Sequence, residues 1–187
     1  MNTKKTQEKL SERTVVLRDN ALNIFTDGSS LPHPRRGGIG IRFVTTDTAG
    51  DEIIENHCPP GYKGATNNQM ELMACIKALE MACDHPMLDT VNEVWLYTDS
   101  MYVTGNMSNA MFGWHKSRWM NRSNRPIENA ELWKDLVRTI KKVPRGVRFQ
   151  WVKGHSKNAH NKAVDKLAKQ SAEGILNKSL RVTTVRR

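Results

Sequence analysis

Residues 21–30 read ALNIFTDGSS, and residues 94–103 read VWLYTDSMYV. In each stretch a run of apolar, β-branched and aromatic residues, typical of a buried strand, leads into Thr-Asp and then Gly or Ser. Each Asp is therefore expected where a strand gives way to a turn. A single Asp at such a place is an ordinary turn or cap residue. If the two strands are neighbours in one sheet, the carboxylates of Asp27 and Asp99 project side by side from its edge.

Around these two stretches the chain alternates further strand and helix patterns. Strands are expected over 22–26, 37–46, 51–57, 94–98 and 147–152. Helices are expected from 67 to the break before 86, as short pieces across 102–119, over 129–142 and over 162–176. Three sequential strands followed by β-α-β units predict an α/β fold, in which helices pack on the faces of a mixed five-stranded sheet.

The composition fits one ordinary domain with short tails. The chain has 187 residues, of which 38% are apolar and 26% charged, and this excludes collagen-like, coiled-coil and wholly disordered classes. No run approaches 18 apolar residues, so no transmembrane helix is expected, and the N-terminus lacks the apolar segment of a secretory signal. Cys58, Cys75 and Cys83 lack metal-ligand spacing, and the last two are expected in the core. We expect a reduced, cytoplasmic location and no membrane partner.

Positive charge is concentrated at the C-terminal end. The 29 Lys and Arg residues exceed the 19 Asp and Glu residues, which gives a formal net charge of +10 and favours a polyanionic partner. We divide the chain into a short charged extension over 1–19, a catalytic domain over 20–173 and a basic tail over 174–187. The tail carries four basic residues and no acid.

Two further acids extend the pair formed by Asp27 and Asp99. Glu71 falls in the first turn of the helix that begins at 67, and Asp165 lies near the start of the last helix. Taken alone, each is explained as a helix-start acid that the macrodipole favours. If all four meet, each pair of carboxylates 4 Å apart costs about 4 kcal/mol at an effective dielectric constant of about 20.

Hard divalent cations with oxygen ligands would remove that cost. Magnesium suits a site made of carboxylates, water and a substrate phosphate. Two such ions about 4 Å apart can clamp the attacking and leaving oxygens of a phosphodiester displacement. The acids are therefore candidates for a metal-dependent nuclease site.

Four strings of sequence carry a specific resemblance. They are TDGS at 26–29, TNNQMEL at 66–72, TDSMYV at 98–103 and VKGHSKNAHNKAVDKLA at 152–168. In this order they resemble ribonuclease HI, the type 1 ribonuclease H family, over about 22–173. The resemblance implies a ribonuclease-H-like fold and an endonuclease that cuts the RNA strand of RNA–DNA hybrids. It implies two Mg²⁺ ions, with Mn²⁺ as an alternative, and products with 3′-hydroxyl and 5′-phosphate ends.

The same resemblance assigns roles to individual residues. The metal ligands, which are also catalytic, would be Asp27, Glu71, Asp99 and Asp165. His155 would be the loop histidine that assists proton transfer or product release. Asn161 matches a loop asparagine of the family and is a candidate substrate contact.

Two stretches are candidates for holding the hybrid. Residues 109–129, here called the basic segment, read NAMFGWHKSRWMNRSNRPIEN, and their four Lys and Arg residues precede the first acid, Glu128. Cations interleaved with aromatic rings can grip phosphates and stack on bases, and the resemblance implies a basic protrusion that holds the DNA strand. The candidate contacts in this segment are Trp114, Lys116, Arg118 and Trp119. Asn67, Asn68 and Gln69 fit helix capping, and the resemblance places them near the minor groove of the hybrid.

Two other functions stay open at this point. One is a different nuclease of the ribonuclease-H-like superfamily, which the order Asp, Glu, Asp, Asp argues against. The other is a non-catalytic RNA–DNA hybrid-binding module, which the retention of all four acids argues against. We expect a monomer, and we expect Trp133 and Trp151 in the core because they fall on helix and strand patterns.

Overall fold

One sheet organises the protein. The structure is a computed structural model, and it describes residues 15–47, 49–154, 158–174 and 176–177. Within these residues the sheet has the order β6-β5-β1-β2-β4-β7, with β3 paired to β2. The strands are β1 (Ala21–Pro32), β2 (Arg35–Thr46), β3 (Glu52–His57), β4 (Gly61–Lys63), β5 (Glu93–Thr98), β6 (Gly146–Trp151) and β7 (Leu176–Asn177). The β1–β2, β2–β3 and β2–β4 pairs are antiparallel, whereas the β1–β5, β5–β6 and β4–β7 pairs are parallel.

Most of the helices begin at a side-chain cap. They are α2 (Asn67–Cys83), the 3-10 helix η1 (Pro86–Thr90), α3 (Met101–Phe112), α4 (Ala130–Lys142) and α5 (Ala159–Glu173). Thr66 and Gln69 form a capping box at the start of α2, and the hydroxyl of Ser100 accepts from the backbone N–H of Val103 at the start of α3. The side chain of Asn158 caps α5, so this helix begins three residues earlier than predicted.

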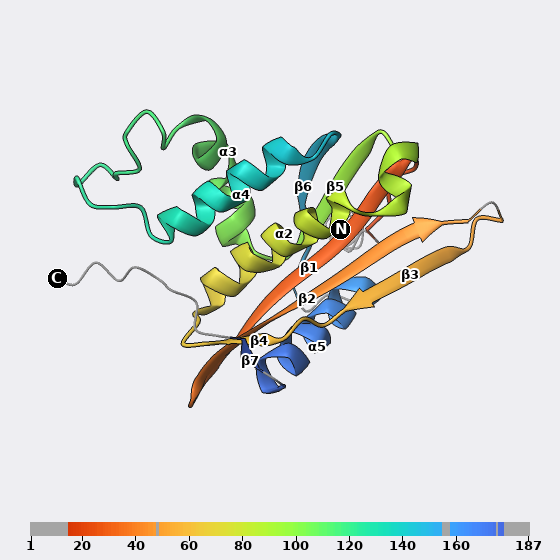
Figure 1. Ribbon diagram of the computed structural model, residues 1–187, viewed down its shortest axis with the longest axis horizontal. Coiled ribbons are helices and arrows are strands. Elements are labelled where there is room, and N and C mark those ends of the chain that lie inside the picture. The colour runs from red at the N-terminus through yellow and green to blue at the C-terminus, as the bar shows by residue number, and fades with distance from the viewer. Residues whose placement is uncertain (1–14, 48, 155–157, 175, 178–187) are drawn as a thin grey trace, which may run out of the picture.

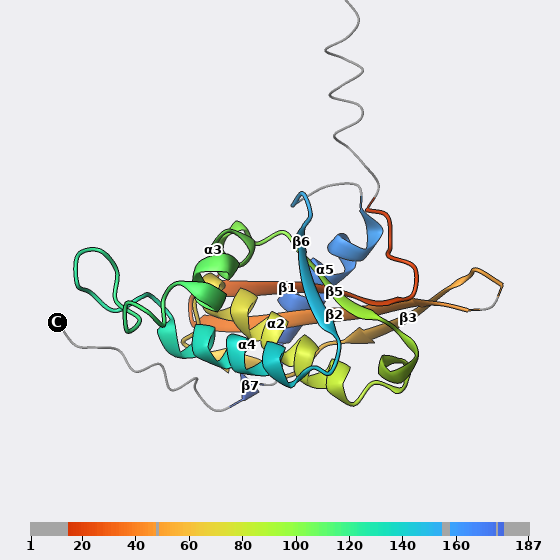
Figure 2. The ribbon, with the colours of Figure 1, turned by 90° about the horizontal axis from the view of Figure 1, so that it is seen from above.

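The helices cover the sheet on both faces. Helices α2 and α4 lie on one face and α5 on the other, as the two views show (Figures 1 and 2). The larger core cluster lies on the α2 side and includes Leu79, Leu96 and Trp133, all fully buried. The smaller cluster contains Phe25, Tyr97 and Val164. Burial of both faces is what an α/β sheet requires.

The predicted fold class is confirmed. All five predicted strands are present, and β4 and β7 add two short strands that lack a clear pattern because they have three and two residues. The short helices predicted across 102–119 form one helix, α3, followed by turns in which Arg118 and Trp119 have positive φ. None of the helices in the described part of the chain is both long and apolar enough to cross a membrane.

Several local predictions are wrong. The last helix ends at Glu173 rather than at Leu176, which lies in β7. Strand β1 continues past Asp27 to Pro32, because residues 27–32 keep antiparallel pairs with β2 after the parallel pairs with β5 end at Phe25. Cys83 is exposed on the outer side of α2, whereas Cys75 is buried as expected. Trp151 is 46% exposed rather than part of the core.

Candidate active site

Asp27 is the most buried of the four acids. It is 9% exposed, and its Oδ1 accepts from the backbone N–H of Gly28 at 2.8 Å. Burial, with repulsion from Asp99 and Asp165 and a smaller contribution from Glu71, raises the pKa of Asp27 from 3.8 to about 8. The charges of Asp99, Asp165 and Glu71 all act on this one carboxyl group. The structure therefore places the four predicted acids near one another, in one cluster.

Two glycines allow that convergence. A Cβ on Gly28 would lie 2.2 Å from the backbone nitrogen of Glu71, so only glycine lets α2 approach β1 this closely. A Cβ on Gly40, which pairs directly with Asp27, would lie 2.2 Å from the carbonyl oxygen of Val164 on α5. The two contacts come from α2 and α5 and set how near Glu71 and Asp165 can come to the strand.

Two donors hold the carboxylate of Glu71. The hydroxyl of Ser100 donates to Oε2, and the Nδ2 of Asn67 donates to Oε1 at 2.8 Å. Burial raises the pKa of Glu71, with repulsion from Asp99 acting in the same direction, while the two hydrogen bonds oppose the rise. Ser100 also caps α3, so one side chain joins the start of that helix to the acid carried by α2.

Asp99 lies between β5 and α3. Its Oδ2 accepts from the Nδ2 of Asn161 at 3.1 Å. Asn161 is 3% exposed, and its Oδ1 has no hydrogen-bond partner among the described residues. Because a buried amide oxygen normally accepts a hydrogen bond or binds a cation, this atom marks unused ligand capacity next to Asp99. A Cβ on Gly154 would lie 3.0 Å from the same Asp99 oxygen.

Asp165 is partly exposed. It lies on α5, and its Oδ2 forms an ion pair with the Nζ of Lys169 at 2.7 Å, one helical turn away. Hydrogen bonding to Asp165 raises the pKa of Lys169, and the charges of Asp165 and Asp27 add to that rise. The ammonium group therefore offsets part of the negative charge of the cluster.

The donor set suits hard divalent cations. It offers carboxylate oxygens and an amide oxygen, which are the ligands that magnesium prefers, and a bound cation would relieve the repulsion that raises the pKa of Asp27. Among the described residues, no three His, Cys, Asp or Glu side chains are gathered tightly enough to surround one ion. The carboxylates thus lie within range of mutual repulsion, but they do not form a closed ligand shell.

The three predicted substrate residues of α2 differ in exposure and in the hydrogen bonds that they form. Asn67 is exposed and holds Glu71, and Asn68 is half-buried. Gln69 is buried, and its Oε1 accepts from the backbone N–H of Thr66 at 2.8 Å as part of the capping box. Contact of these three residues with a hybrid stays a prediction.

The basic segment projects from the body between α3 and α4 (Figures 1 and 2). Lys116 and Arg118 are exposed, and no acid of the described residues lies within ion-pair distance of either. Trp114 packs edge-on against the buried Trp133, with ring centroids 5.3 Å apart. Trp114 and Trp119 are both partly buried against the core, so these rings support the segment from below while its cations face solvent.

His155 lies outside the described residues, so its predicted role is not tested by the structure. The described residue before it, Gly154, lies close to Asp99, because a Cβ there would be 3.0 Å from the Oδ2 of Asp99. The described chain therefore passes beside the acidic cluster just before His155.

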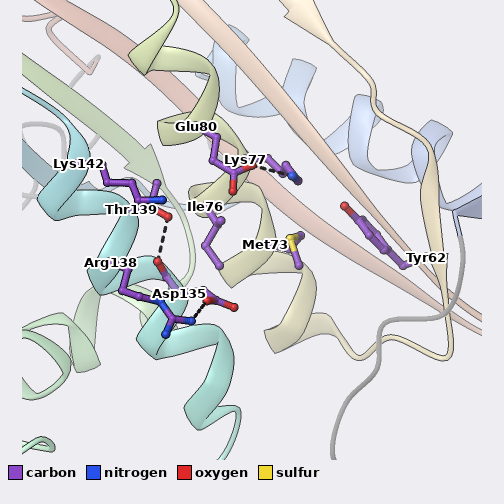
Figure 3. A pocket seen from close by; sticks show the side chains of 9 residues that line it. All are labelled: Tyr62, Met73, Ile76, Lys77, Glu80, Asp135, Arg138, Thr139 and Lys142. Carbon is purple, nitrogen blue, oxygen red and sulfur yellow. Dashed lines mark hydrogen bonds and ion pairs between the residues drawn. The ribbon is translucent and has the colours of Figure 1, made fainter.

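A hollow of about 480 Å³ lies away from the acids, between α2 and α4 (Figure 3). Four of the charged residues that line it are already paired: Lys77 with Glu80 at 2.6 Å, and Arg138 with Asp135. None of the four clustered carboxylates lines it. The hollow therefore adds nothing to the chemistry of the acidic cluster.

Reasoning from the sequence missed the residues that position the acids. Gly28, Gly40, Ser100 and Lys169 were not singled out. Ser100 carried a readable signal, because Ser directly before a helix is a typical N-cap. The glycines are visible in the sequence, but the backbone that approaches each of them is known only from the fold.

Comparison with known proteins gives a consistent result. A family model described as RNase H matches residues 19–173. Ribonuclease H of Novosphingobium aromaticivorans is 39% identical over 151 residues, which cover 81% of this chain and 96% of that protein. Ribonuclease HI of Haemophilus influenzae is 38% identical over 154 residues, which cover 81% of this chain and 90% of that protein.

Solved structures agree in fold. A crystal structure of LC9-RNase H1, described as a type 1 RNase H with the type 2 active-site motif, superposes with a TM-score of 0.69 at 26% identity and covers 85% of this chain and 75% of that one. LC11-RNase H1, solved in complex with RNA/DNA hybrid, gives a TM-score of 0.57 at 21% identity over 81% of this chain and 96% of that one. At this lower identity the second structure supports the fold alone.

Proposed function

This chain belongs to the RNase H family and hydrolyses the RNA strand of RNA–DNA hybrids, and we propose that it does so with two divalent metal ions held by its four clustered carboxylates. The proposal rests on one observation, which is that the charges of Asp99, Asp165 and Glu71 all act on the buried carboxyl group of Asp27. The proposed ligands are Asp27, Glu71, Asp99 and Asp165. Magnesium is the proposed ion, and manganese is the alternative with the same preference for oxygen ligands.

Side chains of this protein would orient the carboxylates that bind the metal ions. Bound ions would supply an activated water and stabilise charge on the phosphate. Ser100 and Asn67 orient Glu71 through hydrogen bonds, and Asn161 orients Asp99. We propose that water attacks phosphorus in line and leaves 3′-hydroxyl and 5′-phosphate ends. His155 would assist proton transfer or product release.

Substrate binding would use surfaces on both sides of the acids. Lys116 and Arg118 would contact phosphates of the DNA strand, and phosphate contacts of this kind do not depend on sequence. Trp114 and Trp119 would support these contacts, and Asn67, Asn68, Gln69 and Asn161 would face the RNA strand. Recognition of RNA requires contacts to its 2′-hydroxyl groups. We further propose that the protein acts as a monomer in the cytoplasm.

The two alternative functions predict different observations. A non-catalytic hybrid-binding module does not need Asp27 held against like charges at the cost of a raised pKa. Another nuclease of the same superfamily would cut duplex DNA or duplex RNA at least as well as the hybrid.

The test is a comparison of three substrates. Labelled RNA–DNA hybrid, duplex DNA and duplex RNA of one sequence are incubated with the protein in the presence of magnesium, of manganese or of a chelator. We expect cleavage of the RNA strand of the hybrid alone, and only with metal. Binding without cleavage would support the binding module, and cleavage in the chelator would remove the metal proposal.

A further inference from the structure

Strand β6 carries a row of apolar side chains whose last member is exposed. Val147, Phe149 and Trp151 alternate along the strand and therefore share one face of the sheet. Val147 and Phe149 pack against the larger core cluster. Trp151, the last of the row, is 46% exposed. An exposed indole of this size is unusual, because Trp is normally highly buried.

The exposed ring is fixed in place beside Asp99. The Nε1 of Trp151 donates to the carbonyl oxygen of Asp99 at 3.0 Å. The next residue, Val152, donates its backbone N–H to the carbonyl oxygen of Thr98 at 2.9 Å. Both bonds attach the end of β6 to Thr98 and Asp99, and the first ties the indole ring itself to the backbone of Asp99.

A second exposed apolar side chain lies two residues after Asp99 in the sequence. Met101, the first residue of α3, is 74% exposed. Helix α3 and strand β6 are in contact. Large apolar groups that remain exposed next to a site often mark a binding surface. Here they adjoin the acid on which the proposed reaction depends.

We propose that Trp151 is a substrate contact, whose exposed ring packs against a sugar or base of the hybrid next to the phosphodiester held at Asp99. This inference rests on the proposed function, because it places a nucleotide at the acidic cluster. A nucleotide fits the ring because every base has a π-face on which an indole can stack without selecting sequence. Its acidic surroundings disfavour an anionic peptide, whereas a hybrid would be held by phosphate contacts with the cations of the basic segment, which do not need metal at the acids.

A purely structural function of Trp151 makes a different prediction. In that case the ring matters only because its N–H holds the carbonyl group of Asp99. Trp151→Phe keeps an aromatic ring and loses the N–H, whereas Trp151→Ala loses both. The two variants therefore separate stacking from positioning. Ile53→Ala is the matched control, because Ile53 is 47% exposed and lies on β3.

The experiment measures hybrid affinity in a chelator, where no cleavage is expected, and then kcat and KM with magnesium. Stacking predicts that Trp151→Ala weakens hybrid affinity by about 5- to 150-fold, whereas Trp151→Phe and Ile53→Ala stay within about 3-fold of wild type. Unchanged affinity of a folded Trp151→Ala variant overturns the proposal. Equal losses of kcat in Trp151→Phe and Trp151→Ala at unchanged affinity also overturn it, in favour of positioning.

Fluorescence provides a measurement that does not require Trp151→Ala to fold. The emission of wild type minus that of Trp151→Phe reports Trp151, and we expect hybrid to quench this difference in the chelator. No quenching at saturating hybrid overturns the contact. Cleavage by wild type in the same preparation tests the proposed function separately, so a chain that cuts hybrids without quenching loses only the contact of Trp151.

Discussion

Asp27 is buried in a strand that α2 and α5 approach across glycines, whereas Lys116 and Arg118 extend into solvent from a run of turns. The first region is fixed by backbone contacts that allow little movement. The second is supported by packed tryptophans, and its charges have no acid partner among the described residues. Catalysis requires ligand atoms at fixed positions, so the region around Asp27 suits it. Binding through charge along a phosphate backbone does not require fixed positions, so the basic segment suits it.

The comparison predicts its largest effect at Gly28. Gly28→Ala places a Cβ 2.2 Å from the backbone nitrogen of Glu71, so α2 must retreat from β1. We expect turnover to fall by about 100-fold, as for a small displacement of a catalytic group. The free energy of unfolding should fall by about 1–3 kcal/mol because of overpacking. Hybrid cleavage and chemical denaturation measure the two effects.

Gly105→Ala is the matched control. Gly105 lies inside α3, and a Cβ there meets nothing within 4 Å. Because Ala is the better helix former, the control should gain about 0.5–1 kcal/mol of stability and keep its turnover. Equal turnover in the two variants would contradict the idea that the close approach at Gly28 positions Glu71.

The second prediction concerns pH in the absence of metal. Asp27 has a pKa of about 8 in the folded protein and an ordinary value of 3.8. The folded protein therefore keeps a proton that the unfolded chain releases, and stability should fall as pH rises from about 4 to about 8. The release of one proton makes the free energy of unfolding fall by up to about 1.4 kcal/mol per pH unit.

Asp27→Asn removes this titration. The metal-free variant should show a flatter dependence on pH than wild type and should melt at a higher temperature at pH 8. Thermal melts in a chelator across pH 4–9 measure the difference. Parallel curves for the two proteins would mean that the cluster does not strain Asp27.

The third prediction concerns the basic tail. Residues 178–187 carry Lys178, Arg181, Arg186 and Arg187 and follow β7, which pairs with β4. If most of these charges contact phosphates, truncation after Asn177 should flatten the dependence of log affinity on log salt by about 2–3 units. Turnover at saturating hybrid should hardly change, since all the proposed ligands precede the tail. Superimposable binding lines from 50 to 200 mM salt would leave the tail without a role in binding.

The smallest expected effect belongs to a single cation of the basic segment. Lys116→Gln should flatten the salt dependence of hybrid binding by about 1 unit and leave the preference for hybrid over duplex DNA unchanged. Lys77→Gln is the control, because Lys77 is already paired with Glu80 at 2.6 Å. A loss of turnover at saturating hybrid in Lys116→Gln would show that this segment positions the reaction as well as the substrate.

The sequence predicted the acidic region better than its surroundings. The strand patterns and turn residues around Asp27 and Asp99 are local signals, and they led correctly to one cluster. The Gly-Ser-Ser turn signal after Asp27 was misleading, because pairing with β2 extends β1 to Pro32. Positive φ at Arg118 and Trp119 is uncommon for such residues, and no pattern predicts it. The alternation in β6 predicted the face on which Trp151 lies, but not that the last side chain on this face is exposed.

The central claim is that a carboxylate cluster around Asp27 carries out catalysis while other groups bind the hybrid. It is tested most directly by measuring cleavage and hybrid affinity for wild type and Asp27→Asn in one preparation. Asp27→Asn should remove several kcal/mol of transition-state stabilisation by the metal ions, so the cleavage rate should fall by about 1,000-fold or more. Hybrid affinity should stay within about 3-fold of wild type. Near-normal cleavage by Asp27→Asn at saturating magnesium would contradict the claim.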